Sequence, residues 1–236
     1  MPKAKLLFAS VLGGAAVALC SLIATAQEFS PNAGQSAGHN VSGPQKLVDD
    51  STKVVRRMQK DPKLRALMTR AQGVLIIPNY GKGAFIVGAK SGEGVLLVRE
   101  TGGRWSNPAF YNLPGGAEIG GEFGPIAYIL MSPHAVRSLT NARNVALNAD
   151  SGFTLVTWSH KTEDHIGPVD VVLWSGAEKG TKPKPSEAVR GNLLSQDYAA
   201  NDQYYRARNL DTGAVLQGRV FNPRAAPLQQ SLSGLG

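Results

Sequence analysis

The sequence predicts an α+β fold, with a curved, mainly antiparallel β-sheet, an N-terminal amphipathic helical segment and short flanking helices. Three observations predict it. Residues 44–60 repeat apolar side chains at helical spacing. From residue 73 the apolar residues instead form short runs that closely spaced glycines separate. Because these runs follow one another so closely, antiparallel hairpins are the expected connections.

The helical segment has an apolar side and a basic side. The apolar side contains Leu47, Val48, Ser51, Val54, Val55 and Met58. The basic side contains Lys53, Arg56, Arg57 and Lys60. Asp61 and Pro62 suit the N-cap and the first position of a second helix. In that helix the apolar stripe continues through Leu64, Leu67 and Met68, beside Lys63, Arg65 and Arg70.

The rest of the chain divides into strands, short helices and loops. Strands are expected at 74–77, 84–89, 94–99, 109–113, 117–131, 153–159, 169–175 and 214–221. Helices are expected at 132–142, where Ser132 can cap the start, and at 197–208. Residues 179–186 are rich in lysine and proline and are expected to form a loop.

Residues 1–26 have the pattern of a secretory signal peptide. Lys3 and Lys5 precede an apolar stretch at 6–23, and 24–26 fit a small-x-small cleavage site. Export to the periplasm or cell envelope is the expected localisation. An uncleaved membrane anchor and lipoprotein processing at Cys20 are the alternatives. Cys20 is the only cysteine, so cleavage after residue 26 leaves no disulfide, thiolate site or cysteine nucleophile.

Composition supports one folded domain between two polar ends. The chain has 236 residues, of which 42% are hydrophobic and 18% charged, enough to bury a core. Residues 27–43 and 222–236 are small and polar, and are expected to form a flexible linker and a flexible tail. The domain is therefore expected at 44–221.

The charge balance indicates an acidic partner. The formal net charge is +8, and removal of Lys3 and Lys5 lowers it to +6. Anionic lipid or another polyanion fits this excess. Nucleic acid is disfavoured because an exported protein rarely meets it. A merely soluble basic surface is the alternative interpretation.

No motif indicates catalysis, a cofactor or a metal. The glycines at 81–83, 115–120 and 120–124 lack the spacing of phosphate loops, dinucleotide fingerprints and nucleophile elbows. The one group with metal-ligating chemistry is predicted to be a solvated loop: His160, Glu163, Asp164 and His165. An enzyme would need His160 or His165 beside Glu118 or Glu122. We therefore predict a non-enzymatic protein.

The densest motif is the stretch 102–111, here called the Trp105 cassette. Its aromatic residues Trp105, Phe110 and Tyr111 either pack in the core, or line an apolar pocket or touch lipid. Aromatic residues at strand spacing are typical of a core, so packing is the favoured interpretation.

Taken together, the central motifs resemble the SYLF-domain family of lipid-binding proteins, in a bacterial exported form. The similarity runs over about 46–220 and rests on the stretches at 71–78, 83–88, 92–96, 105–111 and 120–124. Asp197, Asn201 and the pair Tyr204-Tyr205 are similar to the family's closing helix. The sequence at 180–185 departs from the glycine-aromatic-glycine stretch that the family usually has there.

The resemblance implies a module that binds phosphoinositides or other anionic lipids through a basic amphipathic helix. The expected lipid-binding residues are Lys53, Arg56, Arg57, Lys60, Lys63, Arg65 and Arg70, with Met58 and Leu64 inserting into the membrane. The expected partner is an anionic phospholipid membrane surface. The alternative is a structural or protein-interaction module of the cell envelope, in which the helix packs its stripe and a protein partner replaces the lipid.

Overall fold

The computed structural model describes residues 43–80, 90–114, 124–158, 168–176 and 193–235. All of them belong to one compact unit, His39–Gly236. Several expected features lie outside the described residues. These are the signal peptide at 1–26, the linker before Gly43, the strand at 84–89, the first part of the strand at 117–131 and the loop at 179–186.

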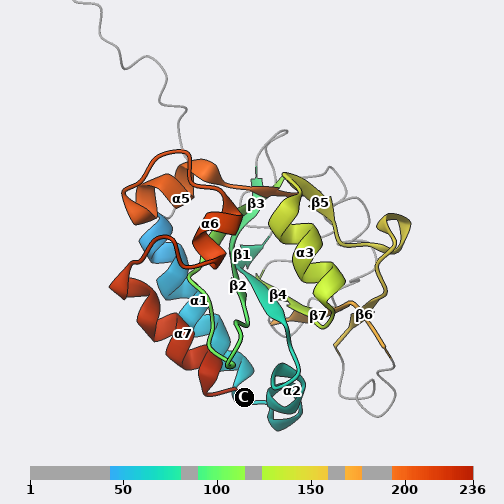
Figure 1. Ribbon diagram of the computed structural model, residues 1–236. Helices are drawn as coiled ribbons and strands as arrows, with labels where there is room; N and C mark the ends of the chain where they lie inside the picture. The colour runs from blue at the N-terminus through green and yellow to red at the C-terminus, as the bar shows by residue number, and fades with distance from the viewer. Residues whose placement is uncertain (1–42, 81–89, 115–123, 159–167, 177–192, 236) are drawn as a thin grey trace, which may run out of the picture. The chain divides into compact units, whose positions relative to one another are not determined.

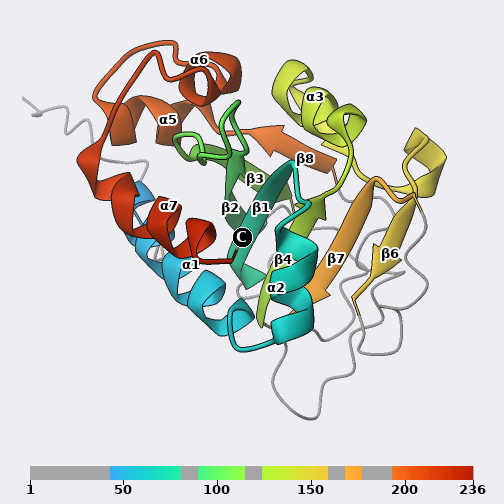
Figure 2. The same ribbon diagram turned by 60° about the horizontal axis from the view of Figure 1, so that its bottom comes forward.

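The described strands form one curled sheet in the order β5-β8-β3-β2-β1-β4-β7-β6 (Figure 2). Their bounds are β1 (Gly73–Tyr80), β2 (Lys90–Val98), β3 (Ala109–Pro114), β4 (Gly124–Leu130), β5 (Asn144–Ala146), β6 (Leu155–Thr157), β7 (Val171–Ser175) and β8 (Leu193–Gln196). Neighbouring strands pair antiparallel, except that β6 and β7 pair parallel. The predicted α+β class is confirmed.

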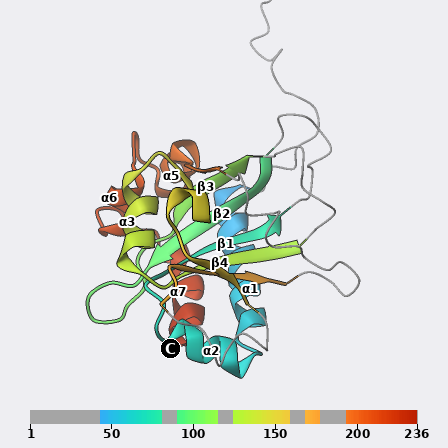
Figure 3. The ribbon, with the colours of Figure 1, turned by 90° about the vertical axis from the view of Figure 1, so that its right-hand side faces the viewer.

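Helices cover both faces of the sheet (Figure 1, Figure 3). Their bounds are α1 (Pro44–Met58), α2 (Pro62–Met68), α3 (Pro133–Asn141), α5 (Tyr198–Tyr205), α6 (Thr212–Leu216) and α7 (Ala226–Ser233), with 3-10 turns η1 (Ala149–Ser151) and η3 (Pro223–Ala225). One apolar cluster joins α1, α2 and α7 to one face of the sheet. A second cluster joins α3 and α6 to the other face.

Strand β1 shows why this sheet needs helices on both sides. Its run of four apolar residues places Val74 and Ile76 in the cluster under α1, and Leu75 and Ile77 in the cluster under α3. A strand buried on both faces reads as a continuous apolar run rather than an alternating one. Beside it, a Cβ at Gly94 would lie 2.8 Å from the Ile76 carbonyl oxygen. Glycine at this position therefore allows β2 to approach β1 closely.

Three helices start at side-chain caps, of which Asp61 and Ser132 were predicted and Asp197 was not. The Asp61 carboxylate accepts hydrogen bonds from the backbone N–H groups of Lys63 (3.0 Å) and Leu64 (3.3 Å) at the start of α2. The Ser132 hydroxyl caps α3, and the Asp197 carboxylate caps α5. These short polar side chains satisfy backbone donors that have no partner within the helix.

Two predictions for the C-terminal part are wrong. Residues 214–221 do not form a strand, because Asp211 caps the short helix α6 and Gly218, at φ +74°, turns the chain after it. Residues 222–236 are not a flexible tail, because η3 and α7 occupy most of them. Leu228, Leu232 and Leu235 of this segment are buried in the cluster under α1. The domain therefore extends beyond residue 221.

Candidate functional site

The seven expected lipid-binding side chains are all exposed in the structure. Lys53, Arg56, Arg57 and Lys60 follow the i, i+3, i+4, i+7 spacing of one helix side along the end of α1 and the turn after it. Lys63, Arg65 and Arg70 follow in and after α2. We call the stretch 53–70 the cationic segment. It carries these seven basic side chains and one acidic one, Asp61.

Ion pairs with the described residues involve few side chains of the cationic segment. Lys53 pairs with Asp50 at 2.7 Å, and Lys46 reaches the same carboxylate at 2.5 Å. Partial burial disfavours the ionised form of Asp50, but the hydrogen bonds from both lysines lower its pKa on balance. Five basic side chains of the segment form no ion pair with another described residue: Arg56, Arg57, Lys60, Arg65 and Arg70.

The expected insertion of Met58 and Leu64 into a membrane is contradicted. Both side chains are 0% exposed and belong to the core under α1 and α2. The whole stripe with them is buried, including Val54 and Val55. Helical periodicity revealed that α1 has an apolar side, but the cover on that side is the sheet together with α7. Only the basic side of α1 faces outward.

The Trp105 cassette belongs to the core, as the favoured interpretation predicted. Trp105, Phe110 and Tyr111 are 4%, 0% and 2% exposed. The Arg99 guanidinium lies 4.6 Å from the centre of the Trp105 ring and donates hydrogen bonds to the carbonyl oxygens of Met68 and Ala71. Arg99, which sequence reasoning did not single out, thus joins the cassette to the end of α2.

Helix α5 holds the other side of the cassette. The Asn201 side-chain oxygen accepts a hydrogen bond from the Phe110 N–H at 3.0 Å, and the Tyr205 hydroxyl donates to the Pro108 carbonyl at 2.7 Å. The Tyr204 ring lies 5.1 Å from the Phe110 ring. The motif residues of the cassette and of the closing helix therefore meet, and their contacts are structural.

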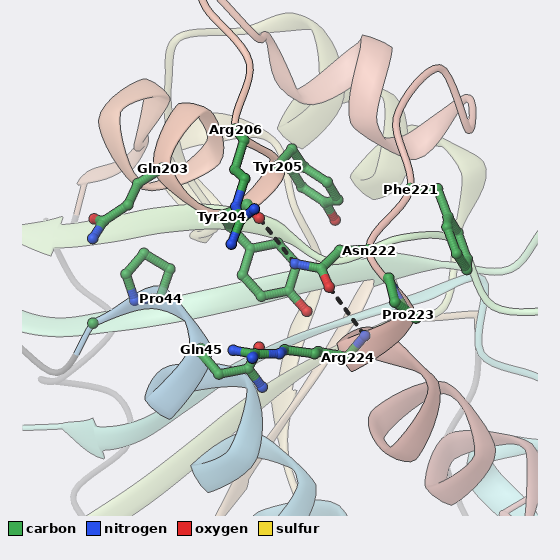
Figure 4. Close-up of a pocket in the computed structure, with 11 residues that line it drawn as sticks. Pro44, Gln45, Gln203, Tyr204, Tyr205, Arg206, Phe221, Asn222, Pro223 and Arg224 are labelled. Atoms are coloured by element: carbon green, nitrogen blue, oxygen red, sulfur yellow. Dashed lines mark hydrogen bonds between the residues drawn. The ribbon is translucent and has the colours of Figure 1, made fainter.

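A pocket that sequence reasoning missed lies between the start of α1, the end of α5 and residues 221–224 (Figure 4). Its volume is about 480 Å³. Tyr204 and Gln45 line it, with Arg206 and Arg224 at its edge (Figure 4). Burial raises the pKa of the Tyr204 hydroxyl, which therefore keeps its proton at neutral pH. Only the pair Tyr204-Tyr205 marked this region in the sequence.

One constellation of Ser132, Asp170 and His134 has the residue types of a hydrolase triad but not its geometry. The Ser132 hydroxyl donates to the Asp170 carboxylate, and the His134 imidazole lies 3.8 Å from the same carboxylate. In a triad the histidine stands between the serine and the acid. Here the carboxylate stands between them, and it also accepts a hydrogen bond from the Thr154 N–H at 3.0 Å.

The predicted solvated loop, and the two glutamates that an enzyme would need beside it, lie outside the described residues. These are His160, Glu163, Asp164, His165, Glu118 and Glu122. Within the described residues, no group of three or more metal-ligating His, Cys, Asp or Glu side chains occurs. None of the helices there has the length and apolar character needed to cross a membrane.

Comparison with known proteins finds relatives among the YSC84-like proteins. SH3 domain-containing YSC84-like protein 1 of Xenopus laevis is 29% identical over 174 residues, which are 68% of this chain and 48% of that protein. Protein YSC84 of Saccharomyces cerevisiae is 28% identical over 167 residues, 68% of this chain and 35% of that protein. Its homologues are therefore YSC84-like proteins.

The similarity extends to further YSC84-like proteins. The human SH3 domain-containing YSC84-like protein 1 is 25% identical over 183 residues, which are 76% of this chain and 45% of that protein. No family model matches the chain. The chain spans less than half the length of these curated relatives. The resemblance predicted from the sequence motifs is confirmed by these matches.

Proposed function

We propose that this SYLF domain binds anionic membrane surfaces electrostatically, through the exposed cationic segment. The observation that carries the proposal is the division of α1. Its apolar stripe is committed to the core, and its basic side chains face outward, most of them without an acidic partner among the described residues. The domain then adsorbs to the headgroup layer as a folded unit and inserts no side chain of the stripe.

The size of the expected effect follows from the number of charges. A basic residue close to an anionic membrane contributes about 1 kcal/mol to binding. The five basic residues without a described ion-pair partner therefore supply about 5 kcal/mol, and Lys53 contributes less because Asp50 already pairs with it. Salt should weaken this binding strongly, since the Debye length falls from about 10 Å at 0.1 M to about 3 Å at 1 M.

The test is co-sedimentation of the domain with lipid vesicles. Wild-type protein should bind vesicles that contain anionic phospholipid at low salt, and should bind them weakly at high salt. The double variant Arg56→Gln/Arg57→Gln removes two charges, so its affinity should fall about 30-fold. The matched control is Arg137→Gln/Arg219→Gln, which removes two exposed arginines on or beside the helices that cover the other face of the sheet. Equal loss in both variants, or binding indifferent to lipid charge, would contradict the proposal.

A second candidate function is a protein-interaction module of the cell envelope. The burial of Val54, Val55 and Met58 favours it, because a packed stripe is what that interpretation requires. In that case the wild-type domain would fail to bind anionic vesicles at low salt. Both candidates are non-enzymatic, and both assign the protein to an exported, periplasmic or envelope location. Export is testable by fractionation of cells that carry the full chain.

A further inference from the structure

The pocket at the start of α1 is built from three segments that are far apart in the sequence. Gly43, Pro44 and Gln45 come from the start of α1, Gln203 to Arg206 from the end of α5, and Phe221 to Arg224 from the turn before α7. Its volume of about 480 Å³ suits a small polar molecule. It lies at the opposite end of α1 from the cationic segment.

Two buried polar atoms of the pocket lining have no hydrogen-bond partner among the described residues. Tyr204 is 6% exposed, and its hydroxyl, an available donor, points toward Gln45 and Arg224 (Figure 4). The Gln45 side-chain oxygen is an available acceptor, because the amide nitrogen of Gln45 already donates to Asp49 at 2.9 Å. Buried polar atoms almost always have partners, so a ligand that accepts from one and donates to the other would complete the site.

The charges around the pocket favour an anion. Arg206 and Arg224 line it, and none of the described residues that line it is acidic. The start of α1 adds a positive dipole end, which no side chain caps and no acidic residue of the first turn neutralises. Asp49 is one helical turn further along α1, and its carboxylate accepts the hydrogen bond from Gln45. Two guanidinium groups and the helix end therefore outweigh this one carboxylate.

We propose that the pocket binds a phosphate ester that carries a free hydroxyl group. The phosphate oxygens accept hydrogen bonds from the Tyr204 hydroxyl and from the guanidinium groups of Arg206 and Arg224. The hydroxyl of the ester donates to the Gln45 oxygen. Such a ligand satisfies both buried atoms with separate groups: its phosphate accepts from Tyr204, and its hydroxyl, several bonds away, donates to Gln45.

Phe221 indicates a lipid as the source of the ester. Its side chain is 74% exposed at the edge of the pocket, an unusual position for a phenylalanine. Beside a bound headgroup, the ring can reach the apolar boundary of the membrane. This assignment of the source rests on the proposed membrane function, while binding of the ester itself does not.

Calorimetric titration of the domain with glycerol 3-phosphate tests the pocket without a membrane. Wild-type protein should bind it, and more tightly than inorganic phosphate. Tyr204→Phe removes only a hydroxyl that has no described partner, so the fold should persist while affinity falls at least about 10-fold. Arg206→Gly should weaken binding similarly, and it relieves the left-handed backbone of Arg206 at φ 53°.

The matched control for this series is Asn209→Gly. Asn209 has φ 55° but does not line the pocket, so this variant relieves similar backbone strain and should bind glycerol 3-phosphate like the wild type. No binding by the wild type, or wild-type affinity in both Tyr204→Phe and Arg206→Gly, would overturn the proposal.

Vesicles distinguish the two sources of the ester. At high salt, where the cationic segment is screened, wild-type protein should retain weak binding to phosphatidylglycerol vesicles, and Phe221→Ser should lose it while still binding glycerol 3-phosphate. Vesicle binding that Phe221→Ser leaves unchanged would overturn the lipid source. Arg56→Gln/Arg57→Gln should weaken vesicle binding at low salt without changing the affinity for glycerol 3-phosphate. A wrong pocket proposal therefore shows in the titration, whereas a wrong membrane proposal shows in vesicle binding at low salt.

Discussion

The Trp105 cassette and the cationic segment differ in burial and in the partners of their polar groups. From Trp105 to Tyr111 the cassette is buried, and its backbone is bonded to side chains of α5 and α7. The cationic segment is exposed, and most of its charges have no acidic partner in the described part of the chain. The densest motif in the sequence therefore builds the scaffold. The less distinctive neighbouring stretch carries the charge that the scaffold presents.

The largest expected effect comes from removal of α7, which supports both regions. Ending the chain at Phe221 exposes the surface that Leu228, Leu232 and Leu235 cover, a loss of about 5–9 kcal/mol of burial. That is comparable with the whole stability of a typical domain, so thermal unfolding should show no cooperative transition. The control Gln230→Ala, an exposed position of α7, should unfold like the wild type. A truncated chain that unfolds normally would mean that α7 is dispensable.

The next largest effect tests the structural role of the cassette. Trp105→Ala should lower the free energy of unfolding by about 3–5 kcal/mol, because it leaves a cavity under α1 and removes the ring beneath Arg99. Urea denaturation measures this change. Vesicle binding at low salt and low temperature, where the variant is folded, should equal that of the wild type. Normal stability combined with lost binding would instead make the cassette a ligand site.

A smaller effect on stability is expected at Asp170, whose carboxylate contacts Ser132, Thr154 and His134. The hydrogen bond from Ser132 is the main cause that lowers the pKa of Asp170 below its ordinary 3.8, and the Thr154 N–H and His134 add to it. A lowered pKa in the folded state means that the carboxylate stabilises the fold above pH 3.8 and ceases to do so as the pH falls through the folded-state value.

Asp170→Asn should therefore be less stable than the wild type at pH 7, by about 1–2 kcal/mol. The two proteins should differ less at pH 3, as urea denaturation at both pH values would show. A difference that does not depend on pH would contradict this role of the carboxylate.

The smallest effect on stability is expected in the cationic segment itself. Arg56→Gln/Arg57→Gln should change the free energy of unfolding by less than about 0.5 kcal/mol, because both side chains are exposed and have no ion pair with a described residue. The same urea measurement applies. A clear loss of stability would mean that these arginines belong to the scaffold, and the contrast with the cassette would disappear.

Local signals explain which elements could be predicted from the sequence. The start of α2 was predictable because Asp61 and Pro62 stand next to each other, and β1 because four apolar residues follow a glycine. Strands β5 and β8 are three and four residues long and depend on pairing with each other and with β3. Helix α7 contributes only Leu228 and Leu232 to the core, within a polar stretch, and Leu235 follows it. Neighbouring residues do not specify such long-range contacts.

The two candidate surfaces differ in the same way. The cationic segment is continuous in the chain, so its residues could be named from the sequence. The burial of Met58 could not be predicted, because helical periodicity identifies an apolar stripe but not whether the protein core or a membrane covers it. The pocket joins Gln45, Tyr204 and Arg224 from distant segments. Only the folded chain brings those residues together.

Hydrogen exchange of α1 in the vesicle-bound domain tests the central claim most directly, namely that the basic side of α1 binds while its apolar side stays in the core. The backbone amides of α1 should exchange as slowly in the bound protein as in the free protein, because the helix stays packed under the sheet. Bound protein in which the α1 and β1 amides exchange faster would show that the stripe leaves the core to enter the membrane, which would contradict this account.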